Sequence, residues 1–95
     1  NAYEFMNKGD VAVEKGNFKE AKRLYKKAQE LNPSNLEMQY WYAITLLNNK
    51  EFDEAKLILK SIFAKNKNWK KLTPRLIKSG LLQISENELT KIMLL

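Results

Sequence analysis

Residues 16–33 read GNFKEAKRLYKKAQELNP, and this stretch decides the fold of the chain. Its apolar residues recur three and four positions apart, which predicts a helix with one buried face. The inward positions are Phe18, Ala21, Leu24, Tyr25, Ala28 and Leu31. Asn17 is suited to cap the helix start, Glu20 completes a pattern close to a capping box, and Pro33 prevents the helix from continuing. The small residues of this helix allow a second helix to approach closely, so an all-α fold is expected.

The sequence repeats itself with a period of 34 residues. A shift of 34 places Phe18 on Phe52 and Ala21 on Ala55. Helices are expected at about 3–15, 18–31, 35–48 and 52–65. A unit of about 34 residues built from two helices is the signature of the tetratricopeptide repeat, and the chain resembles that family over residues 2–69. The resemblance implies an α-α superhelix of two helix-turn-helix repeats.

Small residues mark the places where the helices of each pair should cross. We expect Gly9 to face Ala21 in the first pair and Ala43 to face Ala55 in the second. Two small residues at a crossing let the helix axes approach to roughly 8–10 Å.

Each pair needs a tight turn. Gly16 can adopt the positive φ that such a turn requires. In the second pair the turn falls on Asn48, Asn49 and Lys50, and an asparagine is expected to take the left-handed conformation.

The pattern changes after Asn66. A further helical stretch has Trp69, Leu72, Leu76 and Ile77 facing inward. Pro74 interrupts it in one of two ways: Thr73 caps a fresh helix, or one longer helix continues with a kink. Ser85 and Glu88 form a capping box that opens a last helix. Repeat arrays need terminal elements that cover the last apolar face, and these helices are suited to that role.

The whole chain is therefore expected to be one tetratricopeptide-like domain over residues 1–95. Repeat one spans 2–35, repeat two spans 36–69, and the capping helices span 70–95. The chain starts at Asn1 rather than at Met, so we expect it to be a fragment of a longer protein.

A second resemblance covers residues from about 9 to 94. The motifs that carry it are Asn35-Leu36-Glu37, Trp41-x-Ala43, Glu54-Ala55, Asn68-Trp69-Lys70, Arg75-Leu76 and Gly80-Leu81-Leu82. In this order they resemble the C-terminal domain, described as peptidoglycan-binding, of a family whose main domain is similar to N-terminal-nucleophile hydrolases. The resemblance implies a non-catalytic appendage of a hydrolase-like protein, with any hydrolysis carried out by an upstream domain.

Composition argues against an enzyme. The chain has no Cys and no His, which removes thiol nucleophiles, the usual general base and the commonest zinc ligands. Its glycines are isolated and form no phosphate-binding loop. No cofactor and no metal is expected, and no apolar run reaches the length of a membrane span. A cytoplasmic location is slightly favoured, although a signal peptide preceding Asn1 would change this.

The first helices of tetratricopeptide pairs form a concave face that binds extended peptides in that family. The partner expected here is a protein: an upstream domain of the same polypeptide, a second copy, or a peptide segment. The face is apolar and aromatic with two acids, which suits a hydrophobic or basic segment. An alternative is that the capping helices simply cover part of it. Its residues are Met6, Asp10, Val13, Glu37, Tyr40, Ile44 and Leu47.

The net charge of +6 is concentrated between residues 55 and 85, where eight cations occur without any Asp or Glu. This region is either a solvated surface or a binding face for cell-wall glycan or another polyanion. Nucleic acid is disfavoured, because the chain has only two Arg and no base-reading motif. Trp41 and Trp69 are expected in the core, with sugar stacking as the alternative for both. The residues of the alternative site are Lys65, Lys67, Trp69, Lys70, Lys71, Arg75 and Lys78.

Overall fold

The computed structural model describes residues 1–95 and contains six helices and no strand. The helices are α1 (Ala2–Glu14), α2 (Phe18–Leu31), α3 (Leu36–Asn48), α4 (Phe52–Lys65), α5 (Asn68–Lys78) and α6 (Glu86–Met93). The predicted all-α fold is confirmed, and the first four helices begin and end within one residue of the expected positions.

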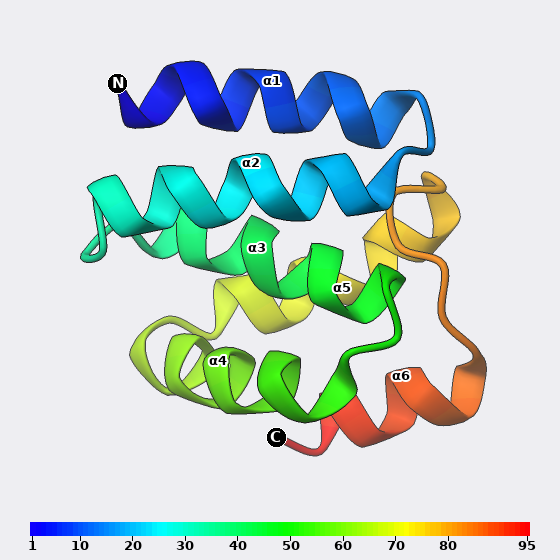
Figure 1. Ribbon diagram of the computed structural model, residues 1–95. Coiled ribbons are helices and arrows are strands. Elements are labelled where there is room, and N and C mark those ends of the chain that lie inside the picture. The colour runs from blue at the N-terminus through cyan, green and yellow to red at the C-terminus, as the bar shows by residue number, and fades with distance from the viewer.

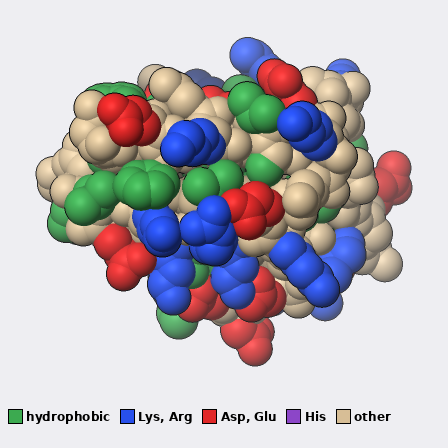
Figure 2. Space-filling view, turned by 45° about the horizontal axis from the view of Figure 1, so that its top comes forward, with side chains coloured by type: hydrophobic (Ala, Val, Ile, Leu, Met, Phe, Trp, Pro, Cys, Tyr) green, Lys and Arg blue, Asp and Glu red, His purple; other side chains and the backbone are tan.

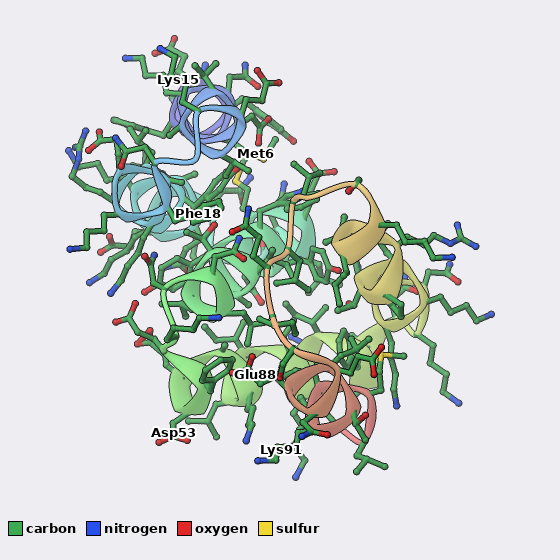
Figure 3. The ribbon with its side chains drawn as sticks, turned by 90° about the vertical axis from the view of Figure 1, so that its right-hand side faces the viewer. Met6, Lys15, Phe18, Asp53, Glu88 and Lys91 are labelled. Atoms are coloured by element: carbon green, nitrogen blue, oxygen red, sulfur yellow. The ribbon has the colours of Figure 1, made fainter.

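The helices α1 to α4 form a stack in which each packs on the next along the chain (Figure 1). Viewed from the side, α5 and α6 lie on the same side of this stack (Figure 3). The segment between them, residues 79–85, passes across the stack near the end of α3. This arrangement leaves one flank of α1 facing α3 and another flank without a neighbouring helix.

The core is centred on α3, because this helix is apolar nearly all round. Eight of its residues are buried: Met38, Tyr40, Tyr42, Ala43, Ile44, Thr45, Leu46 and Leu47. A helix that is hydrophobic on every side is stable only when neighbours surround it. In contrast, α2 buries one stripe, Ala21, Leu24, Tyr25 and Ala28. Leu31 was expected in that stripe but is 59% exposed at the helix end.

Gly9 lies at the crossing of α1 and α2, and its close neighbour is the ring of Tyr25. A Cβ at Gly9 would lie 2.7 Å from Cε1 and 2.8 Å from Cδ1 of that ring, and the three nearest atoms all belong to Tyr25. The expectation that Gly9 permits a close approach is correct. The atoms nearest to that position belong to an aromatic ring, so Tyr25 takes part in the crossing where Ala21 was the expected neighbour.

The two hairpin turns use different residues at equivalent positions. Gly16 has φ +74°, as predicted. In the second turn Lys50, not an asparagine, has φ 64°. The expectation for the asparagines was wrong, because α3 extends through Asn48 and Asn49 caps it with φ −90°. Their side chains bond other parts of the chain: Asn49 Nδ2 donates to the carbonyl of Phe18 at 3.0 Å, and Asn48 bonds the 79–85 segment.

Helix α5 continues through Pro74, so the alternative of a fresh helix starting at Thr73 is excluded. The Thr73 hydroxyl bonds within the helix, 2.9 Å from the carbonyl oxygen of Trp69. The Ser85–Glu88 capping box of α6 is complete. The box at Asn17 is only half formed, because the Glu20 carboxylate pairs with Arg23 instead of reaching back to the cap.

Candidate protein-binding groove

A groove of about 390 Å³ runs between α1 and α3. Five of the seven residues expected on the concave face line it: Met6, Asp10, Val13, Glu37 and Ile44. In Figure 3 the side chain of Met6 extends from α1 toward α3. Helical periodicity brings these residues together, since each helix presents positions three and four apart on one face.

Tyr40 and Leu47 are absent from this surface, because both are fully buried. The ring of Tyr40 packs against Trp69, with ring centroids 4.8 Å apart, and its hydroxyl lies 2.8 Å from Oγ1 of Thr73. Burial raises the pKa of Tyr40 to about 12, despite the opposing effect of this hydrogen bond. Helix α5 therefore covers Tyr40, as the alternative reading of the sequence allowed.

Six further residues line the groove that sequence reasoning did not place there: Glu14, Tyr25, Trp41, Thr45, Asn48 and Leu81. Four of them could have been found, because Glu14, Trp41, Thr45 and Asn48 extend the same helical faces. Trp41 was expected in the core but is only half-buried, and its ring borders the groove. Tyr25 and Leu81 come from outside α1 and α3 and carry no such signal.

Tyr25 forms the base of the groove beside Asp10. Its hydroxyl donates a 2.5 Å hydrogen bond to Oδ1 of Asp10, although the tyrosine itself is only 2% exposed. Burial, and then the neighbouring carboxylate, raise the pKa of Tyr25 well above its usual value. The phenol therefore remains a donor and fixes the orientation of the Asp10 carboxylate.

Three carboxylates border the groove, those of Asp10, Glu14 and Glu37, and no Lys or Arg lines it. None of the three takes part in an ion pair. The ion pairs of the chain lie elsewhere and join Glu4 to the N-terminus, Glu20 to Arg23, Glu51 to Lys22 and Glu88 to Lys50. The groove is thus an acidic region on a protein whose net charge is +6.

Asn48 holds the segment that closes one end of the groove. Its Nδ2 donates to the carbonyl of Leu81 at 3.0 Å, and its Oδ1 accepts from the backbone N–H of Gln83 at 2.8 Å. Lys50 Nζ donates to the carbonyl of Gln83 at 3.0 Å. These bonds place Leu81 against α3. The turn between α3 and α4 therefore helps to shape the groove.

The basic residues of the alternative site lie apart from the groove, at the end of α4 and along α5. All are exposed except the half-buried Lys70 and Trp69. None of the cations takes part in an ion pair. The Trp69 ring is stacked against Tyr40, which removes one face of it from any sugar. The full set is Lys65, Lys67, Trp69, Lys70, Lys71, Arg75 and Lys78.

The groove presents apolar surface and carboxylate oxygens. Its amide and hydroxyl side chains, those of Asn48, Thr45 and Tyr25, are already hydrogen-bonded within the chain. No group of three or more His, Cys, Asp or Glu side chains could hold a metal ion. No helix is both long and apolar enough to traverse a lipid bilayer.

Comparison with known proteins supports one of the two resemblances. A family model described as "Tetratricopeptide repeat" matches residues 12–74. Neither the curated proteins nor the solved structures gave a match. The similarity to a peptidoglycan-binding appendage stays a prediction. The matched residues include α2, α3 and α4 and make up more than half of the sequence, and the chain therefore belongs to the tetratricopeptide repeat family.

Proposed function

We propose that this chain is a non-catalytic protein-interaction module that binds a basic, partly apolar segment of a protein partner in the groove between α1 and α3. The observation that carries the proposal is the lining of the groove: an apolar base bordered by Asp10, Glu14 and Glu37, with no cation among the lining residues. Unpaired carboxylates beside apolar surface complement a segment in which Lys or Arg alternates with apolar side chains.

The apolar residues of the groove would supply most of the affinity. Met6, Val13, Trp41 and Leu81 come from three parts of the chain and converge on one hollow. Each apolar Å² removed from water contributes about 25 cal/mol, and a large aromatic such as Trp is typical of an energetically dominant contact.

The carboxylates would supply the selection. The positive net charge of the chain repels basic partners at long range, but charges are screened beyond about 8 Å at physiological ionic strength. At contact distance the acids of the groove therefore dominate. The resemblance to an appended domain suggests that the bound segment belongs to a hydrolase-like domain of the same polypeptide.

The test uses two synthetic peptides of equal length, one with Lys between Leu residues and a twin with Glu in place of every Lys. We expect the Lys peptide to bind in the groove, as measured by methyl NMR shifts of Met6 and Ile44, and the Glu peptide to bind there at least tenfold more weakly. Glu37→Lys should weaken the Lys peptide by roughly tenfold, about 1.4 kcal/mol. The matched control is Asp53→Lys, an exposed acid on α4 outside the groove. Equal effects of the two variants would reject the groove.

A second candidate function is the binding of a polyanion such as cell-wall glycan along α5. The specific observation in its favour is that the cations of α5 recur on the helix surface without a single ion-pair partner. Binding of this kind weakens steeply with salt. Retention on heparin and on purified sacculi should fall in Lys71→Glu/Arg75→Glu and not in Lys19→Glu/Lys26→Glu on α2. No retention at low salt eliminates this candidate.

A further inference from the structure

A second hollow, of about 440 Å³, lies on the opposite flank of α1 from the groove, along its seam with α2. Its α1 side is lined by residues that recur three and four positions apart: Phe5, Lys8, Ala12 and Lys15. Its α2 side is lined by Leu24. A smaller hollow continues from Phe5 to Leu31. Figure 2, which brings the α1 edge forward, shows hydrophobic side chains running across this surface beside Lys and Arg.

The second repeat shows what covers this surface. The residues that follow Lys8, Val11 and Ala12 by 34 positions are Tyr42, Thr45 and Leu46. These three are 6%, 1% and 0% exposed. They are covered because α2 packs on α3, and the bond from Asn49 to the Phe18 carbonyl joins the two hairpins.

In the first repeat Lys8 and Val11 are exposed, and of the three equivalent positions only Ala12 is buried. Val11 is 47% exposed, against 1% for its counterpart Thr45. The position equivalent to the buried Leu46 is Ala12, which is itself 7% exposed. The surface thus has the shape that a neighbouring helix occupies elsewhere in this fold.

The charges on this surface differ from those of the second repeat. Lys8 replaces Tyr42 and Lys15 replaces Asn49 at the equivalent positions. Arg23 is paired with Glu20, whereas Lys8, Lys15 and Lys27 take part in no ion pair. Lys27 Nζ lies 5.4 Å from the centre of the Phe5 ring. Among the residues that line the two hollows, Glu30, beside Leu31, is the only acid outside an ion pair.

We propose that this α1–α2 face binds an amphipathic helix of a partner protein whose apolar stripe is flanked by Asp or Glu. The apolar strip along Phe5, Val11 and Leu24 matches a helix stripe, because a helix packs into the seam between two others. The surrounding cations select the acidic flanks. A symmetric pair of copies through this face would bring Lys8 and Lys15 of both copies together, which disfavours a second copy as the occupant.

The test titrates a different Glu peptide, whose Leu residues lie three and four positions apart, into protein with ¹³C-labelled Val, Leu, Met and Ile methyl groups. We expect shifts at Val11, Leu24 and Leu31 and none at Met6 or Ile44. Val11→Glu, on an exposed position that keeps the fold intact, should weaken this peptide at least tenfold. Lys15→Glu should weaken it severalfold, while the matched control Lys60→Glu on α4 should not.

Three results would overturn the proposal. The first is no saturable binding of the Glu peptide, and the second is shifts confined to Met6 and Ile44. The third is self-association in sedimentation that Val11→Glu abolishes, which would identify a second copy as the occupant. The two proposals can fail separately. Glu37→Lys should weaken only the Lys peptide in the groove, and Val11→Glu should weaken only the Glu peptide on the α1–α2 face.

Discussion

The hydroxyl of Tyr25 on α2 donates a 2.5 Å hydrogen bond to the carboxylate of Asp10 on α1, directly at the base of the groove. The same tyrosine ring occupies the space that Gly9 leaves open. One side chain therefore joins the packing of the first hairpin to the chemistry of the groove. Gly9 admits the ring, the ring positions the hydroxyl, and the hydroxyl orients an acid that a basic partner would meet.

Tyr25→Phe should destabilise the fold by about 1–2 kcal/mol, because it removes a hydrogen bond to a charged acceptor while keeping the ring. Urea unfolding measures this change. Asp10→Asn in a double-mutant cycle isolates the pair, and the effect of Tyr25→Phe should shrink in that background. Additive effects of the two substitutions would show that the bond contributes nothing to stability.

Gly9→Ala should destabilise the fold by about 1–3 kcal/mol, because the added methyl group overlaps the Tyr25 ring. The better helix propensity of alanine, up to about 1 kcal/mol, offsets only part of this. A Tyr25→Leu background should reduce the cost. Gly16→Ala is the matched control, since it has open space but φ +74°, and its cost should not depend on residue 25. A Gly9→Ala variant as stable as the parent contradicts the close approach.

Asn48→Ala should release the 79–85 segment, because it removes both side-chain bonds to Leu81 and Gln83. We expect a loss of about 1–2 kcal/mol in urea unfolding, faster hydrogen exchange at the Gln83 amide, and weaker binding of the Lys peptide. Asn87→Ala on α6, where the side chain makes no hydrogen bond, is the control. Unchanged exchange at Gln83 in Asn48→Ala would contradict the role given to this asparagine.

Stability should fall as the pH rises above about 10, the usual pKa of tyrosine. Burial raises the pKa of Tyr40 to about 12. Burial and the nearby Glu54 raise the pKa of Tyr42 to about 12. Burial raises the pKa of Tyr25 further still. Between the unfolded and folded pKa values the folded state holds more protons than the unfolded state, so stability is complete below pH 10 and is lost above it.

Urea unfolding across this range, with phenolate absorbance as a second readout, measures the alkaline loss. Tyr40→Phe should flatten the decline, and Tyr3→Phe, at a position 53% exposed, should leave it unchanged. A profile that is flat up to the folded pKa values would contradict the burial of these tyrosines.

The helices could be predicted because their signals are local. Each signal can be read from one helix or from two neighbouring helices. These signals are the apolar spacing, the caps at Asn17 and Ser85, and the 34-residue period. A helical period fixes which residues share a face, and this explains why Met6, Asp10, Val13, Glu37 and Ile44 line one groove.

The parts that sequence reasoning missed depend on distant contacts. Tyr40 is buried because α5 returns to α3, as its bond to Thr73, 33 residues later, shows. Leu81 enters the groove through Asn48, again 33 residues away. No local pattern contains these pairings.

The most direct measurement of the central claim is a methyl NMR titration of protein labelled at Met and Ile with the Lys peptide. Met6 and Ile44 line the groove, whereas Met38, Met93, Ile58 and Ile92 do not. We expect saturable shifts at Met6 and Ile44, and we expect Glu37→Lys and added salt to weaken the binding that they report. Shifts confined to the other methyl groups, or none at saturating peptide, would contradict binding of a basic segment between α1 and α3.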